Sequence, residues 1–122
     1  MARVDTIRGG SLRHLVTLQR AVTASDGQGG QEVMSWDGIA TVWADIWPLS
    51  GRDRLQAEQV QSTVLHRALI RFQASPSNPD LPFVAAKDRL IHKGLAHNIR
   101  AVLDLEGRHQ FLELDLESGV AA

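Results

Sequence analysis

Apolar and polar residues alternate along much of this chain, and the alternation predicts β-strands. The clearest case is 110–117, where leucines at every second position are separated by Glu or Asp. Successive side chains of a strand point to opposite faces, so this segment should present one apolar and one acidic face. The same period of two predicts strands at 14–23, 63–73, 88–93 and 95–105.

Each of the longer strands has an apolar side whose members can be named. The residues expected to share a face are Val16, Leu18 and Val22 in the first strand, Ala68, Ile70 and Phe72 at 63–73, Ile99, Ala101 and Leu103 at 95–105, and Leu112, Leu114 and Leu116 in the last strand.

Glycine and proline residues separate the strands. The segment 25–30 holds three glycines and an Asp and predicts a hairpin turn. A second extended stretch is expected at 31–49, interrupted near Asp37-Gly38, and Pro48 should end its pairing because proline has no N–H to donate. The proline-rich segment 75–82 should be a loop.

One segment has the character of a short helix. Ser50 and Asp53 have the spacing of a capping box, and good helix formers follow at 55–59. The apolar face is thin, essentially Leu55 and Val60, so this helix should lie on a surface, a channel wall or a subunit interface.

Together these elements predict a mainly β fold, a small antiparallel β-barrel of about six strands with one short helix in a long inter-strand loop. The expected organisation is an N-terminal arm at 1–13, a barrel domain at 14–117 that includes the helix-loop insertion at 50–61, and a C-terminal tail at 118–122.

Composition narrows the function classes. The chain has 122 residues, no cysteine and a net charge of −1. These values favour one domain without disulfides and disfavour tight binding of nucleic acid, which usually requires a basic excess. No apolar run approaches the roughly 20 residues that span a bilayer. The N-terminus lacks the apolar segment of a signal peptide, so we expect synthesis in the cytoplasm and no membrane partner.

A search for catalytic or metal-binding patterns finds none that is specific. The five histidines lack a ligand spacing, although His92 and His97 flank a turn and can meet across a hairpin. The acidic row of 113–117 fits a solvated face, or a strand edge that discourages stray pairing, better than an acid–base pair. We therefore predict no enzymatic activity, no cofactor and no metal.

Several short motifs occur in an order that resembles the phage head-tail adaptor family, also described as head-tail joining, head-closure or stopper proteins. The residues that carry the resemblance run from Gly10-Ser11-Leu12 through Asp26-Gly27-Gln28-Gly29-Gly30, Trp36, Val42-Trp43-Ala44 and Pro48-Leu49-Ser50-Gly51 to Ile70-Arg71-Phe72 and Asn98-Ile99-Arg100-Ala101-Val102-Leu103-Asp104. The chain departs from the family at Asp53, where Glu is common, at His97, where Tyr is common, and in a longer loop at 75–82.

The resemblance implies a structural virion protein of a tailed phage, a prophage or a gene transfer agent. Such subunits form a homo-oligomeric ring, a dodecamer if it follows portal symmetry, at the head–tail junction. The ring closes the DNA-filled head and docks the tail. Its implied neighbours are the portal-bound adaptor above and the tail terminator or tail tube below, and DNA passes through without sequence recognition.

Two alternatives remain open at the level of sequence. One is an oligonucleotide-binding barrel, although the tryptophans here stand beside Ala, Ile, Asp and Pro and not beside Lys and Arg. The other is a different tail component, such as a tail terminator.

Two groups of residues are candidates for function. Candidates for a channel or gating loop are Ser50, Gly51, Arg52, Asp53, Arg54, Leu55 and Glu58. Candidates for subunit contacts are Arg3, Arg8, Trp36, Trp43 and Trp47, with packing of all three tryptophans inside the barrel's own core as the competing interpretation.

Overall fold

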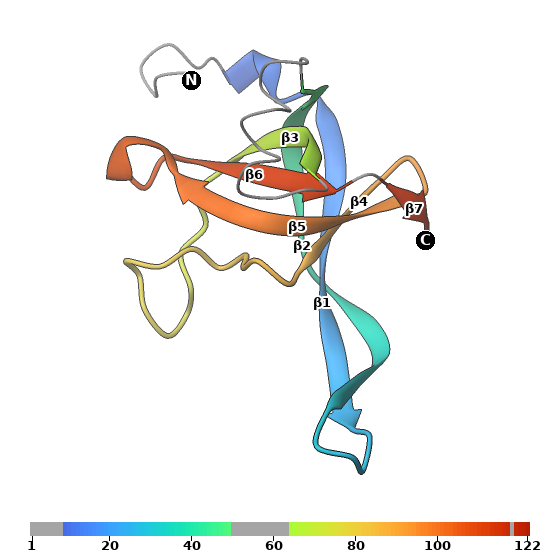
Figure 1. Cartoon of the computed structure of the whole chain (residues 1–122). Coiled ribbons are helices and arrows are strands. Elements are labelled where there is room, and N and C mark those ends of the chain that lie inside the picture. Colours follow the sequence, from blue (N-terminus) through green and yellow to red (C-terminus); the bar gives the residue numbers. More distant parts are fainter. Residues whose placement is uncertain (1–8, 50–63, 118) are drawn as a thin grey trace.

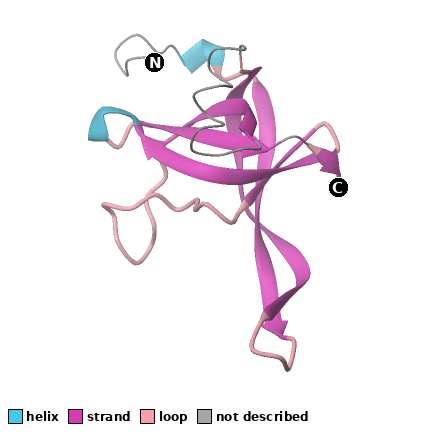
Figure 2. Cartoon of the chain, in the orientation of Figure 1, coloured by secondary structure: helices cyan, strands magenta, loops and turns pink. Residues whose placement is uncertain are grey.

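Seven strands dominate the computed structural model, which describes residues 9–49, 64–117 and 119–122 (Figure 1). The strands are β1 (His14–Ser25), β2 (Gln31–Pro48), β3 (Val64–Arg71), β4 (Arg89–His92), β5 (Leu95–Asp104), β6 (Phe111–Glu117) and β7 (Val120–Ala121). Short 3₁₀ turns lie at η2 (Gly9–Ser11) and η3 (Leu105–Gly107). Figure 2 shows how strands make up nearly all of the regular structure. No helix in the described part of the chain is long and apolar enough to cross a membrane.

All strand pairs are antiparallel, and six of the strands close into a ring. The order is β1-β2-β3-β6-β5-β4, and β4 returns to β1. The closing contact is short, since β1 and β4 pair only at Thr17–Ile91, Leu18–Leu90 and Gln19–Arg89. The prediction of a mainly β fold built from about six antiparallel strands is confirmed.

The core fills the inside of this closed sheet. Leucines 112, 114 and 116 of β6 are fully buried, and their acidic neighbours point to the other face, as the alternation predicts. The other buried members of the cluster are Val16, Leu18, Val42, Ala44, Ala68, Ile70, Val84, Leu90 and Ile99. The inward faces therefore come from all six strands of the ring.

A second, smaller cluster lies on the other face of β3. Leu69 is buried there together with Leu12, Leu105 and Phe111, and Trp47 packs against them. Leu69 alternates with the core residues Ala68 and Ile70, so β3 is covered on both faces.

Two sequence expectations, one about the continuity of a strand and one about a strand face, are wrong at register shifts. No break occurs at Asp37-Gly38, because β2 runs on with a bulge between the pairs Leu18–Ala40 and Gln19–Gly38. In β5 the register shifts between Ile99 and Ala101. Val102 then packs against the core, and Leu103, expected beside Ile99, is 45% exposed.

The β1–β2 hairpin extends well beyond the closed ring (Figure 1). Past Gln19, β1 pairs only with β2 in the described structure. Val22, expected on the core face, is consequently 39% exposed.

The predicted hairpin turn is present at the tip. The Oδ1 atom of Asp26 accepts hydrogen bonds from the backbone N–H groups of Gln28 and Gly30, at 2.7 and 3.1 Å. Gly27 and Gly29 adopt positive φ angles, which glycine tolerates without strain.

The remaining connections also follow the sequence. Residues 75–82 form a loop closed by a bridge between Ala74 and Pro82. Lys93 and Gly94, both with positive φ, turn β4 into β5. In the expected C-terminal tail, Val120 and Ala121 pair with Ala96 and Leu95. The expected helix at 50–61 and residues 1–8 of the N-terminal arm lie outside the described residues.

The fold predicts an asymmetry between two leucine-to-alanine substitutions. Leu114→Ala removes a fully buried side chain and should lower the free energy of unfolding by about 2–5 kcal/mol. Leu103→Ala, the matched control at a site 45% exposed, should cost less than about 1 kcal/mol. Urea unfolding followed by circular dichroism measures both, and equal losses would contradict the assignment of faces.

Candidate assembly surfaces

Trp43 lies on the outside of the closed sheet. It is 57% exposed and stands directly opposite Leu15, itself 55% exposed, across the β1–β2 ladder. The interpretation that all three tryptophans fill the core is therefore wrong for Trp43. Two large apolar side chains side by side in solvent form a patch of the kind that partners cover.

The other two tryptophans are half-buried and lie in different surroundings. Trp47 packs against the small cluster on the outer face of β3. Trp36 lies in the extended part of the hairpin, where the guanidinium of Arg89 stacks 4.2 Å from the ring centroid. The three rings thus do not form one continuous surface.

All of the remaining candidate residues fall outside the described structure. They are Arg3 and Arg8 of the arm and the gating candidates Ser50, Gly51, Arg52, Asp53, Arg54, Leu55 and Glu58. Leu49, which immediately precedes this segment, is buried, and its N–H donates to the carbonyl of Leu65 at 2.9 Å. Leu49 is therefore fixed in the body of the protein.

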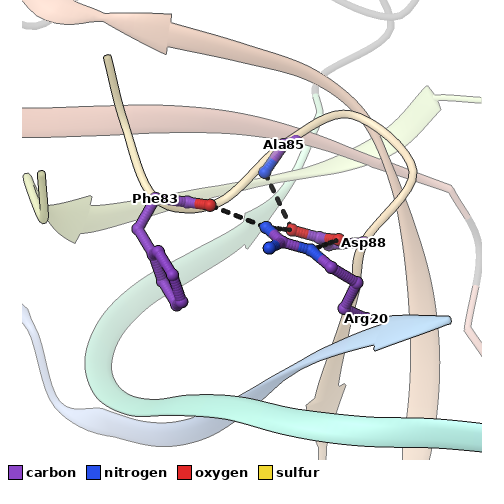
Figure 3. A network of polar contacts seen from close by, with 4 residues as sticks. All are labelled: Arg20, Phe83, Ala85 and Asp88. Atoms are coloured by element: carbon purple, nitrogen blue, oxygen red, sulfur yellow. Dashed lines mark hydrogen bonds and ion pairs between the residues drawn. The ribbon is translucent and has the colours of Figure 1, made fainter. Parts of the chain in front are cut away.

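An ion pair that the sequence did not predict joins Arg20 of β1 to the buried carboxylate of Asp88, just before β4 (Figure 3). The Nε and Nη2 atoms of Arg20 each donate to one carboxylate oxygen of Asp88, both at 3.0 Å. Asp88 is 2% exposed, whereas the Arg20 side chain is 43% exposed. This two-pronged geometry fixes both groups, and the hydrogen bonds that Arg20 donates to Asp88 raise the pKa of Arg20 above its ordinary value.

The same pair also holds the loop before β4. Nη2 of Arg20 donates to the carbonyl of Phe83 at 2.7 Å, and its guanidinium lies over the Phe83 ring at 5.2 Å. The N–H of Ala85 donates to Oδ2 of Asp88 at 2.8 Å (Figure 3). The loop is thereby tied to the base of the projecting hairpin.

The acidic row of β6 is neither an edge nor freely solvated. β6 lies between β3 and β5, so the expectation of a protective strand edge is wrong. Nε of Arg67 lies 2.9 Å from Asp115 and 3.6 Å from Glu113, and Arg100 lies 2.8 Å from Glu117. The three acidic side chains are 11–20% exposed. The row therefore acts as a set of cross-strand ion pairs.

Four histidines meet in two edge-to-face pairs, His14 with His92 and His66 with His97. His92 and His97, which can meet across the β4–β5 hairpin by sequence, are not directly paired, because His92 pairs with Leu95 and His97 with Leu90. Desolvation, followed by the charges of His14, Lys93 and His97, lowers the pKa of His92. No group of three potential metal ligands gathers within the described ranges.

Comparison with known families decides the class of the protein. The family model of the phage head completion protein matches residues 7–119. The chain belongs to the phage head completion protein family. This match confirms the resemblance seen in the sequence motifs and identifies a structural, head-associated virion protein, which is not an enzyme class.

Solved structures agree with the fold of this head completion protein. A chain in the virion of a native gene transfer agent particle is 23% identical, with a TM-score of 0.63 over 90% of this chain and 96% of that one. Protein SF1141 from Shigella flexneri 2a is 20% identical, with a TM-score of 0.63 over 92% and 97% of the two chains. No curated protein is similar enough to count as a relative.

The buried ion pair predicts a large effect for one arginine substitution. Arg20→Met keeps the aliphatic stem but leaves the buried carboxylate of Asp88 with the Ala85 N–H as its donor. The free energy of unfolding should fall by roughly 3 kcal/mol. Arg108→Met, at a site 54% exposed and 3.6 Å from Glu106, is the matched control and should cost less than about 0.5 kcal/mol.

Denaturant unfolding measures this difference, and hydrogen exchange reports its location. In Arg20→Met, the amides of Ala85 and Ile99 should exchange faster, because they donate to the side chain and the backbone carbonyl of Asp88. If the two methionine variants were equally stable, the ion pair would not be holding the loop.

Proposed function

We propose that this protein is a subunit of a homo-oligomeric ring at the head–tail junction of a tailed phage, prophage or gene transfer agent. The ring closes the DNA-filled head and provides the surface on which the tail docks. The observation that carries the proposal is the match to the head completion family across residues 7–119. A role in completing the head requires a protein that assembles at the opening through which DNA enters and leaves.

The structure supports a role in assembly over a role in nucleic-acid binding. An oligonucleotide-binding barrel uses rows of exposed aromatics among basic residues. Here Trp47 packs against an apolar cluster and one face of the Trp36 ring is covered by Arg89, which leaves Trp43 as the most open of the three rings. A net charge of −1 also suits a conduit that does not grip passing phosphates.

The proposed position gives the ring two neighbours. The portal-bound adaptor lies above it and the tail terminator or tail tube lies below it. Twelve copies would match the symmetry of the portal. In this arrangement the segment 50–61, with Arg52, Asp53, Arg54 and Glu58, faces the channel and acts as a gate or as the contact to the adaptor.

Removal of the gene tests the position in assembly. We expect filled heads that lose their DNA and do not join tails, together with free tails of normal appearance. Electron microscopy counts the joined particles, and nuclease protection measures retained DNA. Expression of the wild-type chain in trans should restore both. Tailed, DNA-retaining particles from the deletion strain would contradict the proposal.

Removal of residues 52–60 tests the gate. Because the two buried clusters of the described residues are supplied mainly by the strands, the variant should remain folded, join the particle and yield leaky or tailless particles. Replacement of the same residues by a Gly-Ser linker of equal length is the control for chain length. Particles that are tailed and retain their DNA in both variants would rule out the gate while leaving the ring intact.

A further inference from the structure

The extended part of the β1–β2 hairpin carries apolar side chains that nothing in the described molecule covers. We call residues 21–38 the hairpin arm. Val22, Val33 and Met34 of this arm are 39%, 49% and 63% exposed. The arm projects away from the closed sheet (Figure 1), so these side chains contribute little to the core. Apolar groups presented at such a distance suit contact with another molecule.

All charged residues of the hairpin arm are acidic. It contains Asp26, Glu32 and Asp37 and no Lys, Arg or His. Asp26 is engaged in the turn at the tip. Glu32 and Asp37 are exposed, and neither has an ion-pair partner among the residues that the structure describes. The partner of the arm should therefore combine an apolar patch with basic residues.

An apolar surface bordered by basic residues lies on β1 and β2 themselves, at the end of the hairpin that belongs to the closed sheet. We call it the Trp43 face, formed by Leu15 and Trp43. Arg13 lies immediately before β1, two positions from Leu15, and Lys93 follows β4, the other neighbour of β1. Arg71 ends β3, beside the part of β2 that carries Trp43. All three basic residues are exposed.

The partners of these basic residues leave their charges unneutralised. Arg13 donates to the carbonyl of Gly10, and Arg71 lies over the ring of Phe111 at 5.6 Å. No ion pair joins Arg13, Lys93 or Arg71 to a carboxylate within the described residues. The half-buried Asp45 is the acidic residue nearest to Trp43 along β2. The balance of charge around the face is positive.

We propose that the hairpin arm of one copy of this protein packs on the Trp43 face of the next copy. By the register of β1 with β2, Val22 lies on the same face of the arm as Glu32 and Asp37. Val22 would cover Leu15 and Trp43, and Glu32 and Asp37 would meet the basic border. This inference rests on the proposed function, because it supplies the contact that builds the ring.

The partner that covers the Trp43 face is a second copy of this protein, because each chain carries both the hairpin arm and the face that complements it. Two different patches that fit each other make a head-to-tail contact, and repetition of such a contact closes into a ring when the rotation allows. Contact between two identical arms would instead bring acidic residues together. The hairpin arm and the Trp43 face lie on the same continuous β1–β2 ladder, so each subunit contacts one neighbour through its arm and another through its face.

Cysteine pairs test the contact, since the natural chain has no cysteine. Particles are assembled with the variant Val22→Cys/Leu15→Cys and treated with a short bismaleimide. Denaturing gels should show a ladder of dimers, trimers and higher multimers of this chain. The matched control is Val22→Cys/Leu103→Cys, in which the second thiol replaces another exposed leucine. The control and each single-cysteine variant should give at most dimers.

The outcomes separate this inference from the proposed function. If the chain is present in joined particles but the test pair gives no ladder, or joins to a different virion protein, the arm-to-face contact is wrong and the proposed function stands. If only dimers form with the test pair, the contact is a closed pair and the head-to-tail arrangement is wrong. Absence of the wild-type chain from particles would refute the proposed function itself.

Charge reversal provides a second test that does not depend on thiols. Glu32→Lys/Asp37→Lys changes exposed residues and should reduce incorporation into particles by about tenfold or more, because like charges then face each other. Adding Arg13→Glu/Lys93→Glu should restore incorporation. Wild-type incorporation of the first variant, or no recovery in the combined variant, would overturn the proposal.

Discussion

The closure of the sheet by β4 is the constraint on which the rest of the structure depends. β4 has four residues, and it pairs with β1 on one side and β5 on the other. Without it, β1 and β5 would each present an open edge, and Leu90 would leave the core. The ion pair of Arg20 with Asp88 fixes the chain just before β4. This charged contact stabilises the closure of the sheet, because β4 pairs with β1 at only three positions.

Closure at this point also determines which surfaces remain free. β4 meets β1 only as far as Gln19, so the rest of the hairpin projects beyond the ring and Trp43 stays on its outside. A small closed sheet with a long arm can be anchored on its neighbours while its loops face other components. That division fits a head completion protein, a structural part of the particle.

The sequence predicted the elements that depend on local pattern. The leucines of β6 alternate cleanly because β6 pairs regularly with β3 and β5, and the turn at 25–30 carries its own glycines and Asp. It did not predict what depends on distant partners. Arg20 and Asp88 are 68 residues apart, and the shift that exposes Leu103 arises from the fit of β5 to β6. The acidic row looked like an edge because its partners, Arg67 and Arg100, belong to other strands.

The position of this protein in the particle is measured most directly by a cryo-electron microscopy reconstruction of the neck of intact particles. We predict a ring of this six-stranded fold between the portal assembly and the first tail ring, with each hairpin arm lying against the neighbouring subunit. Density for the fold at the tail tip or on the capsid shell, with none at the neck, would contradict it.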